Sequence, residues 1–324
     1  MRSVRAKIAS ATAWSEPPND VVRDDVAVVV VNYRTPDLTV ACVASVLRSA
    51  GARPRVIVVD NASGDDSVAR LRAAFRGEPA VTVHARDVND GYTGGNNAGV
   101  ALARAAGARW ALLLNSDTVL DADCVRRLVT EAASDHRIAL ATPRIFFGDD
   151  RERLWFGGGR FSLWTGRPVH VGFRRRAARG WRTRRDLAFA SGCALLVRLD
   201  AVRGDPFDAS LFAYAEDLDL SLRVRRAGAR IRYVPDALVW HYEGSSHRRA
   251  GGGGQALRFY LNTRNLLRVV SRHARWYHWP VLAPMLAVNV VARFVAVAVR
   301  DGDWPALGGV ARGVRDAALG RGGR

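Results

Sequence analysis

The chain has 324 residues, of which 48% are hydrophobic and 25% are charged. Such a composition can bury a full core in one large domain or two, which excludes an intrinsically disordered chain. The formal net charge of +18 points to an anionic partner, either nucleic acid, acidic lipid or a phosphate-bearing substrate.

The excess positive charge lies in two segments. Residues 1–150 hold 18 basic and 18 acidic side chains, whereas 151–185 hold 11 arginines against Glu152, and 248–324 hold 13 arginines against three aspartates. A non-enzymatic nucleic-acid-binding protein would explain the total charge but not the neutral first 150 residues. We keep that class as an alternative.

Three cysteines, Cys42, Cys124 and Cys193, lie far apart and match no CxxC spacing. They predict neither a disulfide framework nor a zinc site, and they favour a reducing compartment. Residues 1–25 contain no apolar run of signal-peptide length, so we interpret them as a mobile N-terminal tail.

Apolar runs alternate with helix-like segments through the first half of the chain, which is typical of a βαβ series with a parallel sheet covered on both faces. We expect strands at 26–33, 55–60, 80–85 and 110–117, with helices at 37–49, 65–75 and 97–106 between them. Further strands are expected at 190–198 and 229–241. A glycine run from residue 251 predicts a hinge before an apolar helix at about 256–271.

The segment AEDLDLSLRVRRAG, residues 215–228, alternates apolar and polar residues as a strand would, but its acids come first and its arginines last. The dipole of a helix favours this charge order, and Gly228 suits a C-terminal cap. We therefore predict a helix of about three turns. Acids in a first turn need no function, so the segment alone leaves open whether Glu216, Asp217 or Asp219 is a base.

Polar residues follow three of the predicted strands. Ligands gather at the carboxyl ends of strands in open parallel sheets, so these residues together predict one crevice, although each cluster alone would suit a turn or a helix cap. They are Asn32, Tyr33 and Arg34, then Asp60 and Asn61, then Asn115, Ser116 and Asp117. The glycine-rich stretch 89–99 matches neither the dinucleotide fingerprint nor the P-loop, so we interpret its glycines as letting the backbone approach a ligand.

Seven stretches then follow one another along the chain: VVVVNYRTPDLTVACVASVL, VVDNASGDDS, NDGYTGGNNAG, LLLNSDT, SGCALLVR, AEDLDLSLRVRRAG and VWHYEGSS. In order and spacing they resemble the motifs of family 2 inverting glycosyltransferases with the GT-A fold, in particular the rhamnosyltransferase-like branch. The resemblance implies an α/β fold whose Rossmann-like, mostly parallel sheet is flanked by helices. It also implies a catalytic domain at 26–247, with a basic acceptor-side insert at 151–185, and a C-terminal helical extension at 251–324.

The resemblance further implies a nucleotide-sugar donor. Asp60 would accept a hydrogen bond from a pyrimidine base, a ring whose imide N–H suits a charged acceptor. The implied donor-binding set is Asn32, Tyr33, Arg34, Asp60, Asn61, Gly94, Asn96, Asn97, Asn115 and Ser116. Within it, the first three residues would lie along the nucleotide, and Gly94, Asn96 and Asn97 would border the ribose and the sugar.

Asp117 resembles the metal-binding aspartate of the family's DxD motif, and His241 stands where a late histidine contacts metal or diphosphate. The implied cofactor is a divalent cation, Mg²⁺ or Mn²⁺, which would neutralise the departing diphosphate. Asn115 replaces the first aspartate of DxD and so removes one formal charge. Without the resemblance, His241 would be interpreted as a histidine of an aromatic strand.

By the same resemblance, Asp217 takes the proton from the acceptor hydroxyl, Glu216 positions the acceptor, and Asp219 serves the start of the helix. The implied enzyme is an inverting hexosyltransferase that uses dTDP-rhamnose or, alternatively, a UDP-sugar. Its acceptor would be a glycan or lipid-linked glycan of bacterial cell-surface polysaccharide synthesis. A sugar nucleotidyltransferase is the alternative enzyme, although its glycine-rich signature with arginine and lysine is missing after the first strand.

Residues 281–299 are apolar except for Asn289 and Arg293, and they have about the minimum length of a membrane span. A helix lying on an anionic membrane avoids burying Arg293; packing on the catalytic domain or in a homo-oligomer is the alternative. We expect a cytoplasmic protein, peripheral on the inner face of the cell membrane, with no nucleic-acid partner. QALRF at 255–259 is similar to the QxxRW motif of processive synthases, but Phe259 replaces the tryptophan, so we expect single sugar additions.

Overall fold

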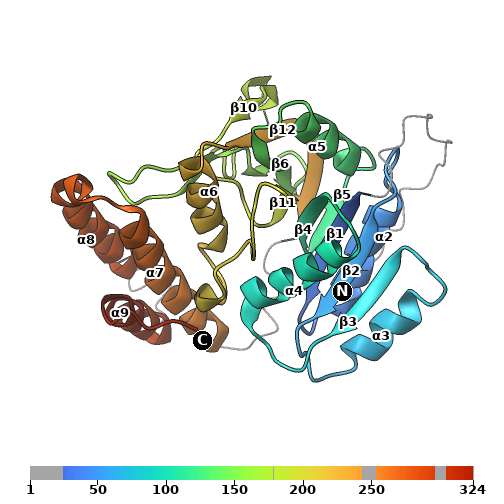
Figure 1. Ribbon diagram of the computed structural model, residues 1–324. Coiled ribbons are helices and arrows are strands. Elements are labelled where there is room, and N and C mark those ends of the chain that lie inside the picture. The colour runs from blue at the N-terminus through green and yellow to red at the C-terminus, as the bar shows by residue number, and fades with distance from the viewer. Residues whose placement is uncertain (1–24, 178, 243–252, 296–303, 324) are drawn as a thin grey trace.

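A computed structural model describes residues 25–177, 179–242, 253–295 and 304–323 (Figure 1). Most of the predicted N-terminal tail therefore lies outside the described residues. The same is true of residues 243–247 at the end of the predicted catalytic domain, of the first two glycines of the predicted hinge, and of 296–299 in the apolar segment.

The core of the described structure is one mixed sheet, with strand order β10-β12-β6-β11-β4-β1-β2-β3, to which β5 and β7 add at β12 and β6. Its strands are β1 Val26–Asn32, β2 Arg55–Asp60, β3 Val81–Ala85, β4 Trp110–Asn115, β5 Thr118–Leu120, β6 Ile138–Phe147, β7 Leu154–Phe156, β10 Arg185–Asp186, β11 Ala194–Arg198 and β12 Arg230–His241. A separate pair consists of β8 Gly159–Arg160 and β9 Val169–His170.

The first half of the sheet is parallel, as the continuous apolar runs predict. β1 pairs in parallel with both β2 and β4, and the registers place Asn32 opposite Asp60 and Val31 opposite Asn115. All valines of β1 except the half-buried Val31 are buried, because neighbouring strands and flanking helices cover them. The three predicted polar clusters therefore do end at one edge of the sheet.

Helices flank this sheet (Figure 1). Their bounds are α2 Pro36–Leu47, α3 Ser67–Ala74, α4 Gly91–Ala105, α5 Cys124–Ala133 and α6 Glu216–Arg226, with 3₁₀ turns at Arg179–Arg182 (η1), Ala209–Leu211 (η2) and Trp276–His278 (η3). The predicted helix at 215–228 is confirmed as α6. Gly228 follows it with φ +81°, the left-handed conformation of a C-terminal cap.

The secondary structure predicted for the glycine-rich stretch 89–99 is wrong. We expected a turn before a helix at 97, whereas α4 begins at Gly91. A Cβ at Gly95 would lie 2.8 Å from the Val31 side chain, and one at Gly99 would lie 2.2 Å from the Val29 side chain. These two glycines therefore let the helix pack closely on β1, a role that outweighs their low helix propensity.

The second half of the sheet turns antiparallel. β11 pairs antiparallel with β4 and β6, and β12 returns parallel to β6. The predicted strands at 190–198 and 229–241 are confirmed in type, but the sequence analysis passed over β6, whose central Pro143 and Arg144 interrupt an apolar run. The basic segment 151–185, which was predicted as an acceptor-side insert, carries the short strands β7 to β10.

The C-terminal helices are α7 Gly253–His273, α8 Trp279–Val295 and α9 Trp304–Ala318, and they lie next to α6, on the side away from α2 and α3 (Figure 1). α7 and α9 approach closely: a Cβ at Gly309 would lie 2.3 Å from the Ala256 carbonyl oxygen. Residues Gly253 and Gly254 belong to α7, so the part of the predicted hinge that is described is helical.

Helix α8 packs on α7 and on the segment around Thr165 through one face. Leu282 and Leu286 are buried against α7, and Asn289 donates to the carbonyl of Thr165. None of the helices in the described ranges is both long and apolar enough to cross a membrane.

Candidate active site

The ends of β1 and β2 form one buried polar network. The Asn32 amide donates to Asp60 Oδ2 at 2.7 Å and to Ser63 Oγ at 3.2 Å, while Asp60 also accepts from the Ser63 hydroxyl at 2.6 Å and its N–H at 3.0 Å. Thr39 donates to Asn32 Oδ1. Asp60 is therefore held rigidly as a charged acceptor. Ser63, which the sequence analysis did not single out, completes its coordination.

Tyr33 and Arg34 border this network at the surface. Tyr33 is 41% exposed, and the Arg34 guanidinium lies 5.2 Å from the centre of its ring. Arg34 has φ +56°, a left-handed conformation fixed by its N–H bond to Ser63 Oγ. Asn61 lies deeper, where its amide donates to Asn89 and its Oδ1 accepts from Arg86. The structure thus brings all five predicted residues together, with Tyr33 facing solvent.

The three predicted residues of α4 differ in their surroundings. A Cβ at Gly94 would lie 2.4 Å from the Asp90 side chain, so this position accepts only glycine without rearrangement. Asn97 exchanges two hydrogen bonds with the backbone of Phe207, which ties α4 to a distant loop. Asn96 donates to the Tyr92 carbonyl, but its Oδ1 is buried with no partner in the described part of the chain.

The end of β4 presents the altered DxD residues. Asn115 donates its N–H to the Cys193 carbonyl, and Ser116 Oγ lies 3.4 Å from Thr35 Oγ1. Asp117 is 8% exposed, and its Oδ1 lies 3.1 Å from Nε2 of His241 at the end of β12. The predicted metal pair is therefore assembled by β12 lying antiparallel to β5.

The Asp117–His241 pair has the donor atoms of a divalent-cation site but not a complete set. Burial of His241 favours its neutral form, yet the interactions with Cys193 and Asp117 outweigh this effect and raise its pKa well above the usual value. Across the described ranges, no group of three or more His, Cys, Asp or Glu side chains is arranged to hold a metal ion. A cation here would need ligands from a substrate or from water, as Mg²⁺ commonly does.

The two carboxylates at the start of α6 have different partners. Asp217 accepts the Gly192 N–H at 2.9 Å and the Leu218 N–H at 2.7 Å, and its side chain is partly exposed. Glu216 is buried, and its Oε2 has no hydrogen-bond partner among the described residues. Backbone N–H groups act on both carboxyls, but those of Gly192 and Leu218 bind Asp217 directly.

These surroundings separate the two acids electrostatically. Burial, together with the negative charge of Asp217, raises the pKa of Glu216 to about 8. Burial also raises the pKa of Asp217, but the N–H groups of Gly192 and Leu218 act in the opposite direction. At neutral pH, Glu216 therefore retains its proton and Asp217 is the carboxyl that ionises first.

A two-residue turn connects the carboxylate pair to the metal pair. Gly192 binds Asp217 through its N–H and accepts the Tyr92 hydroxyl at its carbonyl, while the next residue, Cys193, interacts with His241. Tyr92, Gly192 and Cys193 lie within the motif stretches, but the sequence predicted no role for them. Polar contacts between distant motifs cannot be deduced from any one stretch.

Asp219 lies in the first turn of α6, where an acid serves the helix start as predicted. It has a further role that was not predicted: it is fully buried and accepts Arg223 Nε at 2.8 Å, with His273 Nε2 at 2.9 Å. His273 belongs to α7, so Asp219 joins α6 to the C-terminal helices. No disulfide joins the three cysteines, all of which are described and buried.

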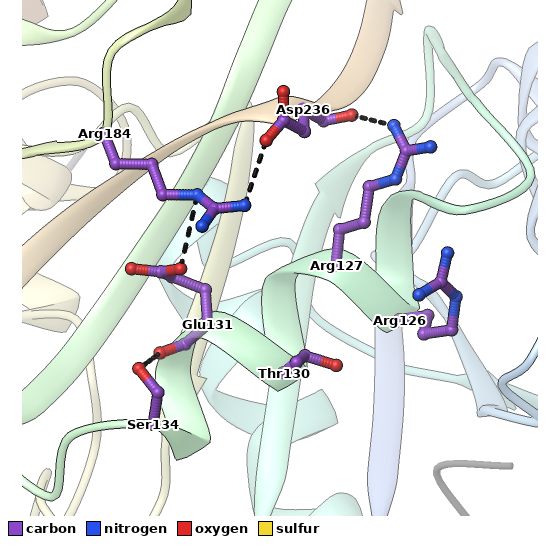
Figure 2. A pocket seen from close by; sticks show the side chains of 7 residues that line it. All are labelled: Arg126, Arg127, Thr130, Glu131, Ser134, Arg184 and Asp236. Carbon is purple, nitrogen blue, oxygen red and sulfur yellow. Dashed lines mark hydrogen bonds and ion pairs between the residues drawn. The ribbon is translucent and has the colours of Figure 1, made fainter. Parts of the chain in front are cut away.

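A surface cavity of about 680 Å³ lies beside α5 and contains none of the predicted site residues (Figure 2). Its charges are paired with one another: Arg184 contacts both Glu131 and Asp236, and Arg127 donates to the Asp236 carbonyl. The lining residues are Arg126, Arg127, Thr130, Glu131, Ser134, Arg184 and Asp236. We therefore place the candidate active site at the sheet edge and not in this cavity.

Solved structures share this architecture. The mannosyltransferase PcManGT of Pyrobaculum calidifontis, in complex with GDP-Man and Mn²⁺, aligns with a TM-score of 0.57 over 98% of this chain and 94% of its own, at 15% identity. GalNAc-T7 with UDP, GalNAc and Mn²⁺ also gives 0.57, over 76% and 47%. TarS of S. aureus gives 0.56, over 90% and 82%. The fold is thus the GT-A fold, as expected.

The sequence model described as Glycosyl transferase family 2 matches residues 27–203, more than half of the chain. The chain therefore belongs to glycosyl transferase family 2. The succinoglycan biosynthesis protein ExoO of Rhizobium meliloti is 36% identical over 33% of this chain. Rhamnosyltransferase WbbL of Escherichia coli is 38% identical over 23% of it, and the N-acetylglucosaminyl-diphospho-decaprenol L-rhamnosyltransferase of Mycobacterium tuberculosis is 33% identical over 30%. These matches span only 28 to 31% of the relatives' own lengths.

Proposed function

We propose that this protein is an inverting glycosyltransferase, which moves a sugar, with rhamnose favoured, from a nucleotide diphosphate donor to a glycan or lipid-linked glycan acceptor. The observation that carries the proposal is the turn at Gly192 and Cys193: Gly192 binds the Asp217 carboxylate, and the next residue, Cys193, interacts with His241 of the Asp117–His241 pair. A base and a diphosphate-binding pair that are held by two adjacent residues suit direct sugar transfer.

On the donor side, we assign the nucleotide to the network at the ends of β1 and β2. Asp60 Oδ1 accepts one hydrogen bond, from the Ser63 N–H, and can accept a second. The imide N–H of a pyrimidine base suits this remaining position. Tyr33 is exposed beside it and offers an aromatic face. We expect dTDP-rhamnose as donor because two of the matched relatives carry rhamnosyltransferase names; a UDP-sugar is the alternative.

A divalent cation, Mg²⁺ or Mn²⁺, would be held by Asp117 and His241. Both side chains are buried and, once the cation displaces the His241 proton, supply one hard oxygen and one imidazole nitrogen, a donor set that leaves positions for diphosphate oxygens and water. When bound, the cation would neutralise charge on the diphosphate as it departs. Two of the structural neighbours are complexes with Mn²⁺, which is consistent with this assignment.

Asp217 acts as the general base. The acceptor oxygen forms its bond to the anomeric carbon while the bond from that carbon to the diphosphate oxygen breaks, and Asp217 receives the hydroxyl proton. One displacement inverts the anomeric configuration. Glu216, protonated at neutral pH because of its raised pKa of about 8, keeps a second negative charge away from Asp217 and can donate a hydrogen bond to the acceptor.

An anionic membrane surface is the partner we assign to α8. Its exposed side chains are apolar around most of the helix, including Val288 and Val291, each about 60% exposed, and Trp276 before it is 83% exposed. Over its described residues α8 is apolar without being a membrane span, and with exposed tryptophan and many arginines nearby such a helix suits the membrane interface. A lipid-linked acceptor would then reach the site from that surface.

Nucleotide diphosphate release from a panel of nucleotide sugars tests the function. We expect release from dTDP-rhamnose, in the presence of a glycan or lipid-linked acceptor, to depend on a divalent cation, and the product, analysed by proton NMR, to have inverted configuration. Pyrophosphate-dependent formation of nucleotide sugars would instead indicate a nucleotidyltransferase. Absence of turnover with every donor, together with tight nucleic-acid binding, would indicate a non-enzymatic nucleic-acid-binding protein.

Sedimentation with phosphatidylserine vesicles tests the membrane assignment. We expect Val291→Asp to abolish sedimentation at low salt, because it places a charge on the apolar face of α8. Leu319→Asp, which changes an equally exposed apolar residue after α9, is the matched control and should still sediment. If the wild-type chain stays in the supernatant and forms a dimer that Val291→Asp dissociates, α8 is a homo-oligomer contact instead.

A further inference from the structure

The loop that leads into the catalytic carboxylates has a strained backbone. Three residues that are not glycine, Phe212, Tyr214 and Ala215, have φ values of +66°, +71° and +63°. Non-glycine residues rarely adopt this conformation, and several in one loop persist only where surrounding contacts impose them. Glu216 and Asp217 follow directly, so the direction of the loop sets where their carboxyl groups point.

Asn265 of α7 supplies the contacts that hold this loop. It is fully buried, and its amide nitrogen lies 2.7 Å from the Leu211 carbonyl oxygen, 2.7 Å from that of Ala213 and 3.0 Å from that of Tyr214. One NH₂ group therefore faces three acceptors within four residues of the loop. The Leu211 carbonyl also accepts the Ala213 N–H at 2.8 Å, while the amide ties the carbonyls of Ala213 and Tyr214 to α7.

Arg264 sets which end of that amide faces the loop. Its Nε donates to Asn265 Oδ1 at 2.9 Å, and its Nη2 donates to the Leu211 carbonyl at 3.2 Å. A rotated amide would bring Oδ1 against three carbonyl oxygens and lose the arginine bond. Arg264 is itself fully buried and also binds the Tyr260 hydroxyl, which in turn donates to Asp316 of α9.

Helix α7 also contacts α6 directly, because His273 of α7 binds the buried Asp219 of α6. On the other side of the loop, Thr93 at the start of α4 donates to the Phe212 carbonyl. The loop is thus clamped between α4 and α7, and α7 lies alongside α6 (Figure 1). Most of this anchoring comes from the C-terminal helices, outside the 27–203 range that matches the family.

We propose that Asn265, oriented by Arg264, is a positioning residue for glycosyl transfer, which fixes the 211–215 loop so that Asp217 faces the acceptor. This inference rests on the proposed function, because it takes Asp217 as the base. It makes α7 part of the catalytic machinery rather than an appended helix. Donor binding, which uses β1, β2 and β4, should not depend on Asn265.

The test compares Asn265→Ala with Asn262→Ala in the full chain. Asn262 lies on the same helix, is partly exposed and makes one bond to the Arg258 carbonyl of its own helix, so its replacement controls for general effects on α7. Three quantities are measured: kcat with the donor found in the nucleotide-sugar panel, the Kd of the nucleoside diphosphate, and hydrogen–deuterium exchange of residues 211–220. Asn265→Ser, which keeps a shorter donor, is a second variant in case the alanine variant does not fold.

We expect Asn265→Ala to lower kcat at least tenfold with Kd changed less than twofold, and to speed exchange in 211–220, whereas Asn262→Ala changes none of the three. Asn265→Ser should fall between. The inference is overturned if exchange of 211–220 is unchanged in the Asn265 variants, or if it rises while kcat stays within twofold of wild type. An active Asp217→Asn variant would refute the proposed base instead, and the Asn265 measurements would still decide whether α7 holds the loop for turnover.

Discussion

The donor side of the candidate site lies at the ends of β1 and β2, and the transfer side lies at the start of α6. The two sides differ in whether their buried polar atoms find hydrogen-bond partners within the protein. On the donor side, Asp60 accepts three hydrogen bonds and Asn61 takes part in three. On the transfer side, Glu216 Oε2 is buried without a partner among the described residues. An unsatisfied buried polar atom is costly, so Glu216 retains binding capacity for a ligand, whereas Asp60 is held in place by the protein and offers a ligand only the remaining acceptor position on its Oδ1.

This contrast predicts that the largest change in rate comes from Asp217→Asn. The variant keeps the shape of the side chain but removes the base, so we expect transfer to fall about 10³-fold, within the range general-base catalysis contributes. Steady-state kinetics with the active donor measures it. Asp66→Asn, which alters an exposed carboxylate far from the carboxylate pair in sequence, is the control. A loss of less than tenfold would remove Asp217 from the base position.

The next largest effect is expected at the metal pair. Asp117→Asn, or removal of divalent cations with EDTA, should weaken nucleoside diphosphate binding about 10-fold to 100-fold, because charge on the diphosphate is then left unbalanced. Isothermal titration with and without Mg²⁺ checks this. Equal affinity under both conditions would show that Asp117 and His241 form a structural ion pair only.

Glu216→Gln should stabilise the protein at alkaline pH. A raised folded-state pKa of about 8 means that folding takes up a proton between the unfolded pKa near 4.5 and pH 8, so wild-type stability falls as pH rises through that window. Glutamine does not titrate. Because Glu216 titrates together with Asp217, we expect Glu216→Gln to raise the free energy of unfolding by about 2 kcal/mol over wild type at pH 8 and to change it hardly at all at pH 4.5. Urea denaturation at both pH values tests this; a constant difference would contradict the raised pKa.

The smallest expected effect is at Asp60. Asp60→Asn turns one acceptor oxygen into a donor within a network of Asn32 and Ser63, which should cost about 1–2 kcal/mol of stability. It should also reduce the preference for thymidine and uridine diphosphates over guanosine diphosphate, without lowering kcat at saturating donor. Titration of the three nucleotides compares these affinities. An unchanged preference would show that Asp60 only supports the turn.

Parts of the fold and of the candidate site could be predicted where the residues of a single segment determine its structure. The valine run of β1 and the charge order of α6 each carry their structure within one segment, and the order of the motifs indicated the GT-A fold. The same local reasoning failed at Gly95 and Gly99, since the residues that explain these glycines, Val31 and Val29, lie on a distant strand.

Contacts over long sequence separations account for what was missed. The role of Asp219 beyond the helix start was not predicted because its partner His273 is 54 residues away. Asn265 carries no signal in the sequence, because it gains its significance only from the carbonyls of Leu211, Ala213 and Tyr214. In the same way, Cys193 had no role until β12 brought His241 beside it.

The most direct test of the central claim measures donor binding and turnover together in two variants, Asp217→Asn and Asp60→Asn. The account predicts a crossed result: Asp217→Asn binds the nucleoside diphosphate as wild type does but does not transfer, while Asp60→Asn binds with altered base preference and transfers at the wild-type kcat when saturated. If Asp217→Asn loses binding and turnover in parallel, or if it transfers at a rate near wild type, the separation of a donor scaffold from a catalytic base is contradicted.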